Sequence, residues 1–295
     1  MKTTRFTLLL TLFTSCAFAQ EYAFKVLANK GTNEIKSGTV WLHLKTGASL
    51  SSGDELKLGE NAYLGLVHKS GKPLEVKKSG SYKVAILESE IKGSSGVLTK
   101  YTDFILSSNS TETKKNRLSA TGAVDRGENY AIKVILPENQ YSGIYSNIAI
   151  VNWEGSETTG PYIVTLKNMF DDELAKVETP ETTFRIDLAD AKFAKENAIL
   201  VDVKSKADPK KASKPHMIKR LPAGEQTTIK ASLTEITGDL AEETALNKFI
   251  LAGFYEEHNL LIDAITAFED AVRMQPEVTA YQEAYDDFLL RHGMK

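Results

Sequence analysis

The chain has 295 residues, of which 42% are hydrophobic and 25% are charged, and its formal net charge is −3. This length allows two or three domains, and the composition is that of a folded globular protein, which argues against a disordered chain. The small negative charge argues against general affinity for nucleic acid or for an anionic membrane surface.

Residues 1–19 have the pattern of a cleavable signal peptide. Lys2 and Arg5 give a positive start, an apolar stretch follows, and Ala17-Phe18-Ala19 forms a small-residue cleavage motif. The apolar stretch is far shorter than the about 20 residues that span a bilayer. We therefore expect an exported protein, periplasmic or secreted, without a membrane span. The single cysteine, Cys16, lies inside this segment, so the mature chain cannot form a disulfide; a lipoprotein anchored through Cys16 is the alternative.

Residues 20–106 alternate apolar and polar side chains, as in "YLGLVHKSG" and "PLEVKKSGSYKVAIL", with Gly- and Ser-rich turns between them. A period of two with frequent turns predicts a compact β domain.

The spacing of certain residues in this domain resembles that of the periplasmic FecR-type domain. The resemblance is carried by Leu44 and Gly47, Gly53-Asp54, the strand Tyr63–His68, Gly71, and Leu74–Val76. It implies a β-rich envelope module that makes protein or glycan contacts. Signalling members of that family carry a cytoplasmic tail and a membrane span ahead of this domain, where this chain has a signal peptide. The resemblance therefore does not imply an anti-sigma role.

Residues 107–128 are polar and lack a hydrophobic period, which predicts a linker. Residues 129–204 then contain five strand candidates: "YAIKVIL", "SNIAIVNW", "PYIVTLKN", "TTFRIDL" and "AILVDV". The order of these strands, with an early Trp153 and Tyr162-Ile163-Val164 after it, resembles a fibronectin type III or immunoglobulin-like sandwich. In such a fold the tryptophan would fill the core.

Residues 205–224 are predicted to be a basic linker. The stretch 204–220, "KSKADPKKASKPHMIKR", holds seven Lys or Arg residues and two prolines. A solvated loop is one interpretation, and a basic binding patch is the other.

Residues 225–295 change to the period of a helix. The spacing L-A-x₂-Y, then A-x₃-F-x₂-A, then P resembles a single tetratricopeptide repeat, carried by Leu251, Ala252, Tyr255, Ala264, Phe268, Ala271 and Pro276. The resemblance implies a helix pair in which the alanines allow a close crossing, the aromatic residues fill the space beside it, and the proline ends the second helix.

One repeat is fewer than the about three that usually stack into a stable array. We therefore expect this tail to gain a further helix from residues 225–245, to pack on a neighbouring domain, to pair with another chain, or to fold as a helical cap. If it is a separable docking module, a chain truncated after Pro222 keeps both β domains folded.

Catalytic and metal-binding patterns are weak. The motifs Lys45-Thr46-Gly47, Ser89 to Lys92 and Ser107 to Asn109 are those of penicillin-recognising enzymes, but their order along the chain is wrong. The five histidines are scattered without metal-ligand spacing. Asp171-Asp172-Glu173 is interpreted as a solvated turn, with a cation site as the alternative. We expect no enzymatic activity, no cofactor and no bound metal.

The sequence thus predicts a multidomain protein, mainly β with an α-helical C-terminus. The leading hypothesis is a non-enzymatic envelope scaffold that binds other envelope proteins, or itself, through the helical tail. The alternative is a glycan- or peptidoglycan-binding protein in which Trp41 and Trp153 stack on sugar rings.

Overall fold

The structure is a computed structural model that describes residues 22–91, 96–108, 130–138, 143–155, 158–237, 240 and 243–295. The predicted signal peptide, residues 1–19, and all but the first two residues of the predicted linker 107–128 lie outside this part of the chain. Two β-rich stretches precede a helical C-terminal region, so the predicted layout of a mainly β chain with a helical C-terminus is confirmed.

The first β unit consists of two four-stranded sheets, ordered β4-β1-β6-β7 and β3-β2-β5-β8. Its strands are β1 (Phe24–Lys30), β2 (Asn33–Ser37), β3 (Val40–His43), β4 (Ser49–Leu50), β5 (Glu55–Leu58), β6 (Tyr63–His68), β7 (Pro73–Val76) and β8 (Gly80–Lys83), and helix α1 (Val84–Glu90) follows. The first β unit has a separate hydrophobic core between these sheets, which includes Leu56, Leu64 and Leu66.

Strand β6 is buried on both faces. Leu64 and Leu66 point into the core of the β unit, whereas Tyr63 and Val67, on the opposite face, join cores formed with the helices. This accounts for the nearly continuous apolar character of the strand, since a strand covered on both sides has no polar face.

Helix α2 (Gly96–Ser108) differs from the prediction, which placed these residues in the β domain 20–106 and at the start of the linker. Tyr101 and Ile105 lie one helical turn apart and are both buried, Ile105 against helix α5. The helical period of this short stretch was hidden by its position directly after a long strand-like region.

The second β unit also has two sheets, ordered β14-β11-β9 and β10-β16-β15-β12-β13. Its strands are β9 (Lys133–Ile135), β10 (Gly143–Ile144), β11 (Ile148–Glu154), β12 (Tyr162–Lys167), β13 (Glu173–Thr179), β14 (Thr183–Asp187), β15 (Ala198–Ser205) and β16 (His216–Arg220), with a short 3-10 turn at Ala191–Phe193. Side chains of both sheets share one core, in which Trp153 meets the Tyr162 ring edge-on at 5.5 Å.

Strand β16 corrects the prediction of a linker over residues 205–224. His216 and Ile218 are buried and alternate with Met217 and Lys219, and β16 pairs with β15 from Val201↔His216 to Ala198↔Lys219. The many lysines around this strand suggested a solvated linker. Their charged ends can reach solvent while the backbone stays in the sheet, so the apolar–polar alternation was not recognised.

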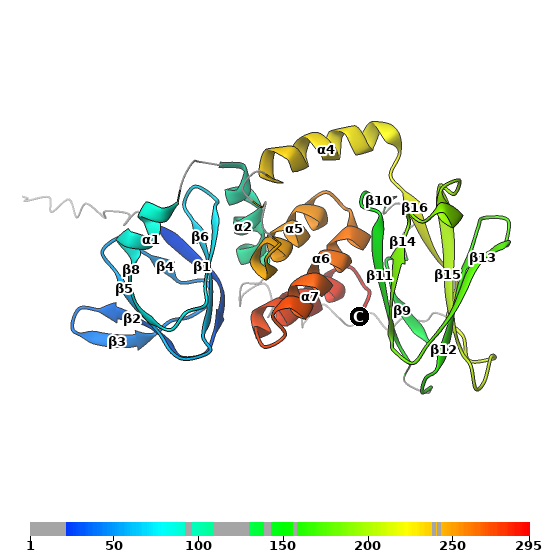
Figure 1. The fold of residues 1–295 in the computed structure, drawn as a ribbon, viewed down its shortest axis with the longest axis horizontal. Helices are drawn as coiled ribbons and strands as arrows, with labels where there is room; N and C mark the ends of the chain where they lie inside the picture. Colours follow the sequence, from blue (N-terminus) through cyan, green and yellow to red (C-terminus); the bar gives the residue numbers. More distant parts are fainter. Residues whose placement is uncertain are drawn as a thin grey trace, which may run out of the picture.

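Four helices follow: α4 (Ala223–Thr237), α5 (Ala245–Glu257), α6 (Leu261–Met274) and α7 (Thr279–Arg291). Although they come last in the sequence, α5, α6 and α7 lie between the two β units, and α4 runs from the second unit back across α5 toward α2 (Figure 1). Among the residues described, no helix combines the length and apolar character that crossing a membrane requires.

The helices join the first β unit through a buried polar network. The Tyr63 hydroxyl donates to Glu75 Oε1 over 2.6 Å, and the amide of Leu246, in the first turn of α5, donates to the same oxygen over 2.9 Å. The hydroxyls of Tyr63 and Tyr281 are 2.7 Å apart. Since Tyr63 donates to Glu75, the Tyr281 hydroxyl donates to Tyr63. The carboxylate thus caps a helix N-terminus whose amides have no partner within the helix.

The helices join the second β unit through Asp263, which is 1% exposed and lies in the first turn of α6. Its two carboxylate oxygens accept the backbone amides of Tyr145 and Ser146, each over 2.8 Å. One turn further along α6, the amide of Ile150 donates to the Thr266 hydroxyl over 3.1 Å. Helix α6 therefore satisfies backbone groups beside β10 and in β11, as a neighbouring strand would.

These contacts make the helical region part of the main core. One cluster of buried side chains runs from Ala28 and Tyr63 through α5, α6 and α7 to Trp153 and the rest of the second β unit. The tail thus packs on both β units, which agrees with the alternative that it packs on a neighbouring domain. This packing conflicts with a separable docking module. We now expect truncation after Pro222 to destabilise both β units, because it would expose apolar surface on each.

We predict that Asp263→Asn lowers the free energy of unfolding by about 2 kcal/mol, because an amide oxygen can replace only one of the two carboxylate acceptors and its NH₂ group would face a backbone N–H. Urea denaturation followed by circular dichroism measures the change. Asp286→Asn is the control, since Asp286 makes surface contacts, an ion pair with Lys295 and a hydrogen bond from Gln282, and the substitution should change stability by less than about 0.5 kcal/mol. Equal stability of the two variants would contradict the role given to Asp263.

Candidate functional site

The residues that carry the tetratricopeptide resemblance lie at the crossing of α5 and α6. Ala252, Ala264, Phe268 and Ala271 are buried, Leu251 and Tyr255 are partly buried beside them, and Pro276 follows the end of α6. Phe268 stacks against Tyr285 of α7, with ring centroids 5.5 Å apart. All seven residues therefore take part in or border packing inside the molecule, and these positions form no open concave groove.

Gly253 is a packing residue that the sequence analysis did not single out. A Cβ atom at this position would lie 2.7 Å from Cγ1 of Ile105 in α2. The absence of a side chain lets α2 approach α5, so that a helix from before the second β unit packs on the helix pair. In the sequence, the adjacent small residues Ala252 and Gly253 were the signal that another element could approach this helix closely.

The two tryptophans proposed to stack on sugar rings have different surroundings. Trp153 is 3% exposed inside the core of the second β unit, so it offers no ring face to a ligand. Trp41, on β3, is partly exposed, and Lys36 Nζ lies 5.9 Å from its ring centroid. The structure therefore removes Trp153 from the proposed stacking pair and leaves Trp41.

The other sequence motifs do not assemble into a catalytic or metal site in the part of the chain that the structure describes. Lys45-Thr46-Gly47 lies in the loop between β3 and β4, and Ser89 lies on α1, where its hydroxyl donates to the Ile86 carbonyl over 2.6 Å. Lys92 and Asn109 lie outside the described residues. No group of three or more His, Cys, Asp or Glu side chains among those described is placed to hold a metal ion.

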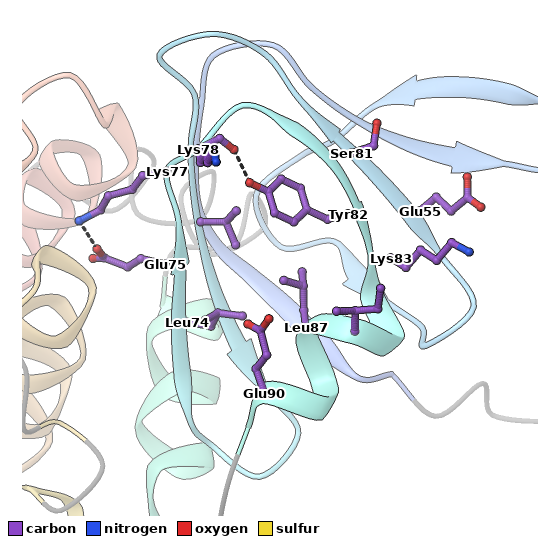
Figure 2. Close-up of a pocket in the computed structure, with 12 residues that line it drawn as sticks. Glu55, Leu74, Glu75, Lys77, Lys78, Ser81, Tyr82, Lys83, Leu87 and Glu90 are labelled. Atoms are coloured by element: carbon purple, nitrogen blue, oxygen red, sulfur yellow. Dashed lines mark hydrogen bonds and ion pairs between the residues drawn. The ribbon is translucent and has the colours of Figure 1, made fainter.

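The first β unit carries a surface groove of about 650 Å³. We call it the β7–β8 groove, because these two strands and α1 form its walls (Figure 2). Its apolar lining consists of Leu74, Val76, Tyr82, Ile86 and Leu87. Ile86 is 57% exposed, so much of its apolar surface is open to a binding partner.

Both strands at this groove are sheet edges. Strand β7 is the last strand of its sheet and pairs with β6, and β8 is the last strand of the other sheet and pairs with β5. The outer edge of each strand therefore carries backbone groups that no neighbouring strand pairs with. Such edges accept an extended segment of another chain.

Strand β7 has one side toward the groove and another toward the helices. Figure 2 shows Leu74 within the groove and Glu75 and Lys77 directed toward the helical region. Glu75 Oε1 accepts hydrogen bonds from the Tyr63 hydroxyl and the Leu246 amide, and Glu75 Oε2 lies 2.5 Å from Lys77 Nζ. Burial alone would raise the pKa of Glu75, but these hydrogen bonds outweigh burial and lower the pKa below its ordinary value.

Charged side chains stand at the ends of the groove. Lys77 and Lys78 lie in the turn between β7 and β8, and Glu90 lies at the opposite end on α1 (Figure 2). Glu55 on β5 is the register partner of Lys83 on β8. Glu55 is paired with Lys36 over 2.9 Å. The groove therefore has an apolar floor and a cationic end at Lys78, an arrangement suited to binding a polypeptide.

Comparison with known proteins gives no match to any protein-family model and none to any curated protein.

His216 yields a prediction about pH. It is 5% exposed, and burial, together with nearby Lys214, lowers its pKa to about 4. The folded state thus favours the neutral ring, so this contribution to stability is complete above pH ~6.5 and is lost as pH falls from ~6.5 to ~4. We predict that the free energy of unfolding of the wild-type protein falls by on the order of 3 kcal/mol over this pH interval because of His216. His216→Gln should not show this part of the decrease.

Chemical denaturation at a series of pH values measures that difference. His43→Gln, which replaces an exposed ring on β3, is the control for the loss of an imidazole. Parallel pH curves for the wild type and His216→Gln would contradict the prediction.

Proposed function

We propose that this protein is a non-enzymatic, exported protein-binding scaffold of the cell envelope, and that the β7–β8 groove is its docking site. The observation that carries the proposal is the pair of free strand edges with an apolar floor between them. A partner segment in extended conformation can add backbone hydrogen bonds to one edge while its alternate side chains enter the groove.

The rigid setting of the groove supports this role. Strand β7 is held from its other side by the Tyr63–Glu75–Leu246 network, so the edge is pre-organised and loses little conformational freedom on binding. The helical region between the two β units would keep their binding surfaces at a fixed separation, as a scaffold requires.

The family resemblances belong to this proposal. The strand order β14-β11-β9 opposite β10-β16-β15-β12-β13, with β10 parallel to β16, supports an immunoglobulin-like assignment for the second β unit. The helix pair α5–α6 supports a tetratricopeptide-like assignment, with α2 and α7 in place of further repeats. The FecR-type assignment of the first β unit rests on the sequence spacing given above, and export rests on the signal-peptide pattern.

The test is a random-peptide display library selected on the mature protein. We predict enrichment of extended peptides with apolar residues at alternate positions, and a loss of affinity on the order of tenfold or more in Ile86→Asp. Val40→Asp is the matched control, since Val40 is as exposed as Ile86, at 57%, but lies on β3 away from the groove. Peptides that bind both variants equally, or no enrichment at all, would refute the groove as a docking site.

The alternative function, glycan or peptidoglycan binding, would now use Trp41 without Trp153. It predicts saturable binding on a glycan array that Trp41→Ala abolishes and Ile86→Asp leaves intact. That outcome, with both variants folded, would replace the protein-binding proposal.

A further inference from the structure

The turn between β12 and β13 presents two apolar side chains to solvent. Phe170 is 86% exposed and Met169 is 48% exposed. We call this turn, residues 168–172, the β12–β13 tip. An aromatic ring exposed to this extent is a candidate anchor for binding, because much of its apolar area can still be removed from water.

The tip is held in one conformation by its own hydrogen bonds. Asn168 is buried, and its Oδ1 accepts the amides of Phe170 over 2.9 Å and of Asp172 over 3.0 Å. Its Nδ2 donates to Asp172 Oδ2 over 3.0 Å, and Asp171 adopts a positive φ of 72°. An anchor that is already ordered loses little entropy when it binds.

The tip is also acidic. Asp171, Asp172 and Glu173 are exposed next to Phe170, and Lys167 pairs with Asp171 over 2.7 Å. This charge disfavours an anionic lipid surface and favours a socket with an apolar floor and a cationic end.

The β7–β8 groove has both of these properties. Its floor is apolar, its volume of about 650 Å³ gives room for both side chains, and the ammonium group of Lys78 lies at one end. Lys78 has no carboxylate within ion-pair distance among the residues that the structure describes. The tip and the groove are therefore complementary in apolar character, and the acidic tip is complementary in charge to Lys78.

A chain cannot place its own tip in its own groove. Strand β13 stands at one end of the long axis of the molecule, and β8 and α1 stand at the other, with the helical region between them (Figure 1). A contact between tip and groove must therefore join two copies.

We propose that the protein assembles head to tail, with Phe170 and Met169 of one copy in the β7–β8 groove of the next. The proposal rests on the proposed function, since it names a second copy as an occupant of the same docking site. Such a contact joins different surfaces on the two copies, so it extends into a chain or closes into a ring. The buried area is small, and we expect a dissociation constant on the order of 0.1–1 mM.

Sedimentation velocity of the mature full chain, from about 10 µM to about 1 mM, tests this assembly. The wild-type weight-average mass should rise past that of a dimer at the upper concentrations and fall back when salt is raised. Phe170→Asp, which removes the anchor, and Ile86→Asp, which removes the socket, should each stay monomeric. Val40→Asp should associate like the wild type.

An equimolar mixture of the two monomeric variants is the decisive measurement. Ile86→Asp retains an intact tip and Phe170→Asp an intact groove, so the mixture should form a dimer and nothing larger. Circular dichroism of each variant excludes unfolding as the cause of lost association. A mixture that stays monomeric, a wild type that is monomeric throughout, or association that either variant leaves unchanged would each overturn the proposal.

The same variants separate this inference from the proposed function. If the wild type is monomeric but display-selected peptides bind it and lose affinity in Ile86→Asp, only the inference fails. If the wild type is monomeric and binds vesicles of phosphatidylcholine and phosphatidylglycerol through Phe170, the tip meets lipid, and the head-to-tail contact is wrong.

Discussion

Two carboxylates fasten the helical region to the β units, the partly buried Glu75 on one side and the buried Asp263 on the other. Glu75 reaches from the first β unit to the N-terminus of α5, and Asp263 reaches from α6 to the amides of Tyr145 and Ser146. Each carboxylate is stabilised because it accepts N–H groups that would otherwise lack partners in a dry interface. Burial raises the pKa of Asp263 above its ordinary value. The hydrogen bonds to its carboxylate therefore offset only part of the free-energy cost of removing the charge from water. Together with the apolar core that runs through the helical region, these two contacts position both β units.

Local pattern was sufficient for much of the secondary structure. Alternation identified strands such as β6 and β11, and the Ala252, Ala264 and Phe268 spacing identified the α5–α6 pair, because these signals arise from neighbours in sequence. Placement of the helices between the β units could not be inferred in this way. It depends on Asp263 and Glu75, two ordinary acidic residues whose partners are more than a hundred positions away. Strand β16 was missed because charged residues surround a short alternation.

The candidate site was harder to infer than the fold. Val76, Ile86 and Leu87 have no sequence feature that sets them apart from other apolar residues, and their grouping around an open groove depends on where the two sheets stop pairing. A sequence does not state which strands are edges, since edge position is a property of topology. Trp153, which had the chemistry of a binding residue, lies instead in the core. Exposed Phe170 carried no sequence signal beyond the acidic turn that surrounds it.

The place of the helical region in the chain has a consequence for biogenesis. Chains are synthesised and exported from the N-terminus, and domains fold largely in that order. The two β units therefore emerge before α5, α6 and α7, the segments that fasten them to each other. Until those last helices arrive, β1, β6 and β11 keep apolar side chains uncovered, which is a state that chaperones and proteases recognise. A chain that lacks the final helices therefore leaves these surfaces exposed, whereas a chain that carries them buries these surfaces.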